Sequence, residues 1–295
     1  MDAHARNWLA RRFDERRPHM QAIAYRMLGS FAEAEEAVQD AWLRVSRADA
    51  GEVENLDGWL TTIVGRVCLN LLRARRVRAR EAPLVHLPDP VVTRAEDPEQ
   101  DAILADSVGL ALLVVLDTLA PAERLAFVMH DMFDLPFDEI GRLVGRSPAA
   151  ARQLASRARR RVRGTAPPPG DHDVARQREV VDAFFAAARD GRFEDLVSLL
   201  DPQAVLRTDG GAARPQVTTL LLGASAIAQR ALQFARPAES FRPVLVNGAA
   251  GVVVLSHGVP FSVMSFTIVG RKIVEIDTIA DPERLRALDL TMLDL

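Results

Sequence analysis

The stretch GRSPAAARQLASRARRRVRG, at residues 145–164, decides the fold of the middle of the chain. Serine caps helix N-termini and proline fits a first helical turn, so Ser147 and Pro148 indicate a helix start. Gly145 can adopt a positive φ in the preceding turn, and Gly141 is small enough for two helices to cross. The stretch therefore predicts the second helix of a helix-turn-helix.

This predicted helix has one apolar and one polar face. Ala151, Ala155, Ala158 and Val162 form the apolar stripe. Arginine and glutamine side chains on the other face can pair with guanine and adenine edges in the major groove, each pair discriminating by ~1–3 kcal/mol. A basic helix that is merely solvated is the alternative, but turn and stripe agree with the charge. The expected DNA contacts are Arg152, Gln153, Ser156, Arg157 and Arg160.

Composition restricts the class of protein. With 48% hydrophobic and 26% charged residues, the composition is typical of a globular protein. The length of 295 residues predicts two or three domains. Cys68 is the single cysteine, so we expect no intramolecular disulfide and no Cys-based zinc site. We also expect no cofactor. The N-terminal segment lacks the apolar core of a secretory signal, and no apolar run is long enough to span a bilayer. We expect a cytoplasmic protein.

Charge is strongly segregated along the chain. Residues 62–80 carry six arginines and no acid, whereas residues 81–106 carry seven acids against Arg94 alone. Two basic stripes on either side of an acidic spacer indicate two separate contacts with a polyanion.

The first segment is predicted to be helical. In residues 31–45, apolar side chains recur at spacings of three and four. A third helix is expected to begin near Asp57 and to bury a stripe from Leu60 to Leu71, which leaves arginines on its opposite face.

The last segment has a different texture. Two amphipathic helices joined at Asp190 and Gly191 precede runs rich in valine and isoleucine, such as KIVEIDTI at residues 272–279. The fold class is therefore multidomain, with two all-α domains followed by an α+β domain.

Two blocks of the first half resemble a known family. AYRMLGSFAEAEEAVQDAWLRV with WLTTIVGRVCLNLLRARR is similar to region two of extracytoplasmic-function (ECF) sigma factors, and LPFDEIGRLVGRSPAAARQLASRARRRV is similar to their region four. The resemblance implies that the second helix binds the beta-prime clamp helices of core RNA polymerase, through Glu35, Glu36, Gln39 and Asp40.

The resemblance also implies two contacts with promoter DNA. The third helix would capture the melted minus-ten strand through Arg66, Asn70, Arg73 and Arg76, although many relatives carry Asp where this chain has Asn70. Region four would bind the polymerase beta flap and read the minus-thirty-five element through the five residues of its recognition helix. Arg80 and its neighbours fit phosphate contacts.

The tail resembles the SnoaL-like, nuclear-transport-factor-two-like cone, in which helices and a curved antiparallel sheet surround a pocket. Three motifs place the chain close to the SigJ-type subfamily. HLPDP (residues 86–90) is similar to the family's Trp-Leu-Pro-Glu-Pro, DGG (209–211) to Asp-Gly-Gly-Gly-Lys, and DPERL (281–285) to Asn-Pro-Asp-Lys-Leu.

From this resemblance we expect the three motifs to form one regulatory interface that tunes sigma activity in cis. Its expected members are Leu87, Pro88, Asp89, Pro90, Asp209, Gly210, Gly211, Asp281, Pro282 and Leu285. Two alternatives remain open. One is a helix-turn-helix regulator with a tail that senses a small ligand, and the other is an enzyme of the ketosteroid-isomerase type.

Such an isomerase needs a carboxylate or histidine base, and the best candidates in the tail are Asp209 and Asp277. Because Asp209 precedes two glycines, a turn is the better interpretation there. We therefore expect no catalytic residues and no metal. The expected domains are region two (1–82), an acidic linker (83–106), region four (107–164), a Pro-rich linker (165–173) and the SnoaL-like domain (174–295).

Overall fold

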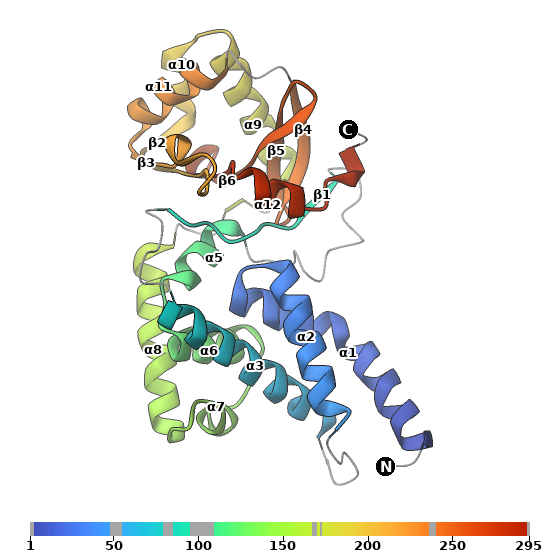
Figure 1. Cartoon of the computed structure of the whole chain (residues 1–295). Coiled ribbons are helices and arrows are strands. Elements are labelled where there is room, and N and C mark those ends of the chain that lie inside the picture. The colour runs from blue at the N-terminus through green and yellow to red at the C-terminus, as the bar shows by residue number, and fades with distance from the viewer. Residues whose placement is uncertain are drawn as a thin grey trace. The chain divides into compact units, whose positions relative to one another are not determined.

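The computed structural model describes residues 3–47, 55–78, 85–94, 109–166, 170–171, 173–235 and 240–293 (Figure 1). The chain divides into two compact units. The first comprises residues 1–81 and 113–166, and the second comprises residues 82–112 and 167–295. Arg80, residues 95–108 of the acidic segment and residues 167–169 of the second linker lie outside the described residues. No described helix is long and apolar enough to cross a membrane.

The first unit is helical, as predicted. Its elements are α1 (Ala3–Leu28), α2 (Phe31–Val45), α3 (Leu56–Arg78), most of α5 (Leu110–Asp117), α6 (Pro121–Phe127), the π-helical turn η2 (Val128–Met132), α7 (Phe137–Val144) and α8 (Pro148–Thr165).

The three N-terminal helices form one bundle. Helix α2 buries the predicted face, with Ala34, Ala37, Val38, Ala41 and Val45. Helix α3 buries Leu60, Val64, Val67 and Cys68, but its stripe ends at Leu72, and Leu71 is exposed. The side chain of Asn55, rather than of Asp57, caps α3 by accepting from the Gly58 N–H at 3.0 Å.

Helix α3 also packs against the helices that follow α5. A Cβ built on Gly65 would lie 2.5 Å from Cε of Met129, so a larger residue there would require the Met129 side chain to move. Arg124 is 1% exposed, donates to the Arg26 carbonyl at 3.2 Å and pairs with Asp117 at 2.8 Å. A buried arginine tied to both halves makes the first unit one packed body.

The helix-turn-helix has the geometry that the sequence predicts. Gly145 ends α7 with φ of 70°, and Ser147 caps α8 by accepting from the Ala150 N–H at 3.3 Å. A Cβ on Gly141 would lie 2.8 Å from the Arg146 carbonyl oxygen, so the crossing requires glycine. Both glycines are therefore explained by backbone geometry.

The second unit is α+β. Its helical elements are α9 (Val174–Arg189), α10 (Phe193–Leu199), η3 (Pro215–Val217), α11 (Ala224–Ala235), α12 (Pro282–Ala287) and η4 (Thr291–Leu293). Its strands are β1 (Val92–Arg94), β2 (Leu200–Asp209), β3 (Thr219–Leu222), β4 (Ser240–Val246), β5 (Ala249–Ser256), β6 (Val259–Val269) and β7 (Lys272–Ile279).

These strands form one sheet in the order β1-β4-β5-β6-β7-β2-β3. The expected all-antiparallel sheet is corrected at one place, because β2 pairs parallel to β7. The first strand comes from the acidic segment: Val92 pairs with Val246 of β4. Residues 85–94 are thus part of the tail's fold, whereas we expected a separate linker.

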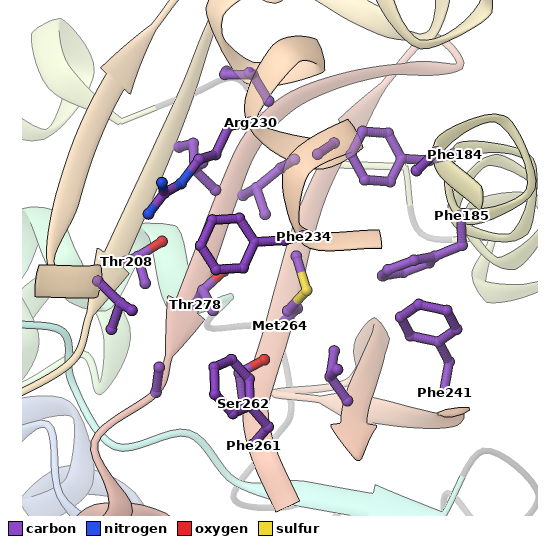
Figure 2. Close-up of a pocket in the computed structure, with 18 of the residues that line it drawn as sticks. Phe184, Phe185, Thr208, Arg230, Phe234, Phe241, Phe261, Ser262, Met264 and Thr278 are labelled. Atoms are coloured by element: carbon purple, nitrogen blue, oxygen red, sulfur yellow. The ribbon is translucent and has the colours of Figure 1, made fainter. Parts of the chain in front are cut away.

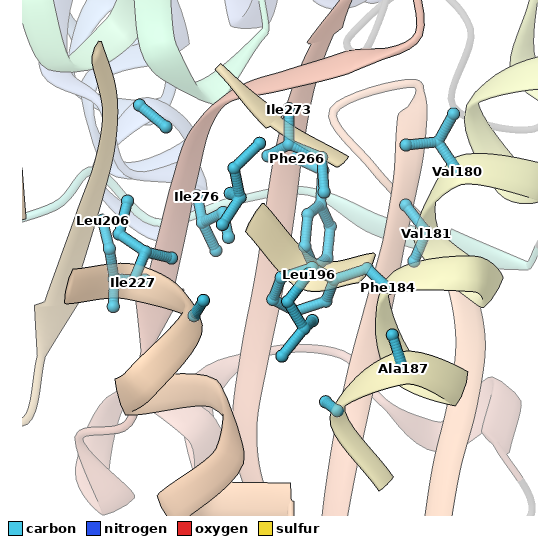
Figure 3. Packing of buried hydrophobic residues seen from close by; sticks show 14 of the residues in the cluster. Val180, Val181, Phe184, Ala187, Leu196, Leu206, Ile227, Phe266, Ile273 and Ile276 are labelled. Atoms are coloured by element: carbon cyan, nitrogen blue, oxygen red, sulfur yellow. The ribbon is translucent and has the colours of Figure 1, made fainter. Parts of the chain in front are cut away.

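Helices α9, α10 and α11 bury a hydrophobic core against one face of this sheet (Figure 3). Phe184 and Phe266 lie at its centre, with ring centroids 5.9 Å apart. Side chains alternate along β7, so Ile276 and Thr278 face the helices while Glu275 and Asp277 face the other way. In β7, the sheet face beneath the helices therefore carries Ile276 and Thr278, and the opposite face carries two carboxylates.

Candidate functional site

The exposed face of α2 is acidic. Glu35, Glu36 and Gln39 are exposed, and Asp40 is half-buried and pairs with Arg44 at 2.8 Å. They lie opposite the buried alanine stripe. The structure thus brings the four expected polymerase-binding residues onto one surface.

The opposite side of α3 from its core presents Arg66, Asn70, Arg73 and Arg76, all exposed. Their spacing of three and four places them on one helix face. Arg75 on the same helix differs, because it donates to the Leu28 carbonyl at 3.0 Å and pairs with Glu33. The four expected DNA contacts are therefore exposed to solvent, whereas Arg75 is held by contacts within the protein.

The five expected contacts on α8 are all exposed. Two of them already have partners in the first unit: the Arg152 guanidinium lies over the Phe137 ring, and Arg157 Nε donates to Glu123 at 2.9 Å. Arg159 on the same helix pairs with Asp131 at 3.0 Å. An exposed ion pair such as that of Arg157 is weak enough to be exchanged for DNA.

The three motifs HLPDP, DGG and DPERL lie together in the second unit. Asp209 is 2% exposed, and its Oδ2 accepts from the Leu87 N–H at 3.0 Å and from Arg284 Nη1 at 2.6 Å. Oδ1 accepts from the Gly211 N–H at 3.0 Å. His86 Nδ1 lies 3.5 Å from Oδ2. One buried carboxylate thus connects all three motifs.

These contacts determine the acidity of Asp209. Burial alone would raise its pKa, but hydrogen bonds from His86 and the Leu87 and Gly211 amides, with the charge of Arg284, lower it to about 2. Asp209 is therefore ionised at neutral pH.

Arg284 is the residue that sequence reasoning missed. Its Nε donates to Asp89 at 2.7 Å and its Nη2 to the Leu87 carbonyl at 2.5 Å, in addition to the bond with Asp209. A signal was present in the sequence, since Arg284 stands where the family's Asn-Pro-Asp-Lys-Leu has its lysine. We call Leu87, Asp89, Asp209 and Arg284 the linker clamp.

Close packing explains the other expected members of this interface. A Cβ on Gly211, whose φ is 61°, would lie 1.8 Å from Asp281 Oδ2, and one on Gly210 would lie 2.1 Å from the Arg214 carbonyl. Asp281 caps α12 by accepting from the Glu283 N–H at 2.8 Å. Besides Leu87, the motifs' buried apolar members are Pro88, Pro90 and Leu285, and Pro282 opens α12.

Asn247 adds a second attachment that the sequence did not reveal. Its side chain accepts from the Val91 N–H, and its backbone N–H donates to the Val91 carbonyl, both at 2.9 Å. Asn247 has φ of 50°, a left-handed conformation that asparagine tolerates. Together with the β1–β4 pairing, it continues the clamp along residues 85–94.

The tail also has a cavity beneath its helices, and neither candidate catalytic carboxylate lines it (Figure 2). Asp209 belongs to the linker clamp, and Asp277 lies on the opposite sheet face, bonded to Arg207 at 2.9 Å. Burial raises the pKa of Asp277 to about 6, opposed by Arg207 and assisted by Glu275. Both carboxylates thus have structural partners.

Cys68 is fully buried in α3, and burial raises the pKa of its thiol to about 12. A buried thiol with so little thiolate serves as a small core residue.

Comparison with known proteins agrees with this architecture. The Sigma-70 region 2 family matches residues 13–78, and the Sigma-70, region 4 family matches residues 109–162. The ECF RNA polymerase sigma factor SigJ of Mycobacterium tuberculosis is 40% identical over 220 residues, which cover 73% of this chain and 69% of the relative. The probable ECF RNA polymerase sigma factor SigI of that species is 32% identical over 276 residues, covering 92% and 93%.

The crystal structure of M. tuberculosis SigJ is similar over the whole fold. Its TM-score is 0.76 at 31% identity, and the match covers 95% of this chain and 99% of the other. Two sigma helical regions followed by an α+β tail define a multidomain sigma-class transcription protein. The chain belongs to the family of ECF RNA polymerase sigma factors. Membership implies that core RNA polymerase and promoter DNA are its partners.

Proposed function

We propose that three exposed helix faces divide the work of promoter recognition. The acidic face of α2 binds the beta-prime clamp helices, the arginine face of α3 holds the melted minus-ten strand, and α8 reads the minus-thirty-five element. The observation that carries the proposal is the agreement of exposure with residue type. Every expected contact on these helices is solvent-accessible, and the opposite faces are buried.

Polymerase binding is tested on α2. The double substitution Glu35→Arg and Glu36→Arg should abolish co-elution with core RNA polymerase, because it reverses the charge of the docking face. The matched control is Glu194→Arg on α10, which is also exposed and acidic. Co-elution of the α2 variant as strong as that of the control would refute the assignment.

We further infer that the tail regulates the sigma regions through the linker clamp. The clamp binds residues 85–94, which connect region two to region four, onto the tail. A linker with a fixed path restricts how far the two DNA-binding regions can separate. A partner that favours the free or the bound linker would therefore shift sigma activity by its differential affinity.

The test replaces Arg284 by methionine, with Arg286→Met as the matched control. Arg286 is exposed in the same helix and donates only to the Pro282 carbonyl, at 3.2 Å, among the contacts of the described residues. We expect Arg284→Met to change transcription in vitro while core binding persists, and Arg286→Met to behave as wild type. Equal transcription by the two variants would refute regulation through the clamp.

Arg284→Met tests regulation by the tail more specifically than truncation of the tail does. Removing the chain after residue 168 also removes β4, the partner of β1, and exposes Leu87 and Val92, which are both buried. A truncated chain therefore combines loss of regulation with exposure of apolar surface.

We infer that the tail does no chemistry. The described side chains that line its cavity include no carboxylate, imidazole, thiol, amine or phenol to act as a general acid or base. Their absence supports a binding role and leaves the ketosteroid-isomerase alternative without a base.

A further inference from the structure

The cavity of the tail has a volume of about 190 Å³ and lies between the sheet and helices α9 and α11. Five phenylalanines line it, together with aliphatic side chains and Met264. An unfilled apolar cavity forfeits packing contacts, so a cavity of this size in a small domain is a binding-site candidate.

The lining is divided into two sides (Figure 2). Phe184, Phe185 and Phe241 lie on one side, and the Phe185 and Phe241 rings are 4.4 Å apart. Thr208, Arg230 and Thr278 lie on the other side. A ligand that satisfies both sides has an apolar, ring-shaped body and a polar end.

Arg230 determines the charge of the polar end. It is the only charged side chain among the described residues that line the cavity, and no described carboxylate forms an ion pair with it. Its guanidinium lies over the Phe234 ring, 4.1 Å from the centroid. An arginine held by an aromatic ring, with its N–H groups free, recognises a carboxylate in a bidentate manner.

Thr278 provides independent evidence for a polar ligand group. The residue is 7% exposed, and its Oγ1 has no hydrogen-bond partner in the described structure. A buried hydroxyl without a partner is costly, and a ligand oxygen would remove that cost once the Thr278 side chain rotates to turn Oγ1 toward the cavity. Thr278 and Arg230 line the same side (Figure 2).

We propose that this cavity binds a small monocarboxylate with a single apolar ring, whose carboxylate pairs with Arg230 and accepts a hydrogen bond from Thr278. The size follows from the volume, since a dry cavity of about 150 Å³ accommodates benzene. The remaining space fits a short carboxylate arm. The proposal concerns binding alone and stands whether or not the clamp regulates transcription.

Phenylacetate is the probe, and calorimetry with the purified full-length chain is the measurement. We expect phenylacetate to bind and its neutral amide, phenylacetamide, to bind at least tenfold more weakly, because the amide lacks the charge that Arg230 recognises. Arg230→Met should weaken phenylacetate binding at least tenfold. Thr278→Val, which keeps the shape, should weaken it by roughly twofold to tenfold.

Arg242→Met is the matched control. Arg242 is exposed and follows Phe241 in β4, so it points away from the cavity and its loss should leave binding unchanged. Equal binding of phenylacetate and phenylacetamide, unchanged binding by Arg230→Met, or no binding of phenylacetate by the wild-type chain would each overturn the proposal. The comparison of the two ligands on the wild-type protein decides the question even if a variant fails to fold.

Discussion

Arginine serves opposite purposes on the exposed helix faces of the first unit and in the linker clamp of the second. On α3 and α8, Arg73, Arg76 and Arg160 are exposed, and no described residue pairs with them. In the second unit, Arg284 is 17% exposed and bonds to two carboxylates and a carbonyl. A charged side chain already satisfied by the protein stabilises the fold, whereas one left in water remains available to DNA phosphates and bases.

The largest effect should come from Arg284→Met. The substitution leaves the buried Asp209 carboxylate without its cation, and breaking such a pair costs about 3 kcal/mol. Chemical denaturation should show this loss for the tail, while Arg286→Met should stay within ~0.5 kcal/mol of wild type. Equal stability of the two variants would show that the contacts of Arg284 do not stabilise the tail.

The next effect is on DNA binding by α3. Replacing Arg66, Arg73 and Arg76 together by alanine should weaken binding of the minus-ten single strand, because three phosphate-pairing charges are lost. The dependence of log affinity on log salt should become shallower by about 2. Binding measured in a salt titration checks this.

The matched control for α3 is the triple alanine variant of Arg11, Arg12 and Arg17 on α1, of which Arg12 and Arg17 pair locally with Glu15 and Asp14. A salt dependence as steep in the α3 variant as in this control would place the DNA elsewhere.

A smaller effect on stability is expected from the lowered pKa of Asp209, the buried carboxylate of the linker clamp. The pKa of Asp209 is about 2 in the folded chain and near 3.9 in an unfolded one, so its contribution to stability is present above about pH 4. About 2 kcal/mol should be lost as pH falls from 4 toward 2. Asp277, whose pKa is raised to about 6, has the opposite sign, since its ionisation opposes folding as pH rises from about 4 to 6.

Unfolding of wild type and of Asp209→Asn, measured across this acidic range, isolates the contribution of Asp209 to the free energy of unfolding. The difference in unfolding free energy between the two should shrink as pH falls below about 4. A difference that is independent of pH would mean that Asp209 is not held ionised by the clamp.

The smallest effect is expected for Arg157→Ala. Its ion pair with Glu123 is partly exposed, so the folded chain should lose ~1 kcal/mol of stability or less. Transcription from the cognate promoter should fall, and the preference at one minus-thirty-five base pair should relax by ~1–3 kcal/mol. Sequencing of selected promoter libraries measures this preference, and an unchanged preference would argue against base readout by Arg157.

Local patterns predicted much of the first unit. Ser147, Gly145 and Gly141 act within a few residues of their positions in the chain, so the helix-turn-helix could be derived from spacing alone. The exposed faces of α2 and α3 follow from the helical period in the same way. The end of the buried stripe at Leu72 rather than Leu71 depends on tertiary packing, which no period reveals.

The second unit was harder to predict because its key contacts are distant in sequence. Strand β1 has three residues, and its partner β4 lies about 150 residues later, so no local signal identifies it. Strand β4 contains Pro243, which normally argues against a strand. Only Val244, Leu245 and Val246 of β4 pair with β1. Pro243 therefore has no partner in β1, and its missing N–H is tolerated on that side. The contacts of Arg284 with Asp89 and Asp209 join residues 195 and 75 positions apart, so the sequence indicated the basic position but not its partners.

The central claim is that exposed arginines select the promoter while Arg284 controls how the tail holds the linker. Transcription in vitro with core RNA polymerase on a randomised promoter library tests both parts, with wild type, Arg284→Met and an Arg152→Ala, Arg160→Ala double variant. We predict that Arg284→Met changes the amount of transcript but selects the same bases, and that the double variant selects altered minus-thirty-five bases. A changed consensus for Arg284→Met with an unchanged one for the double variant would contradict the account.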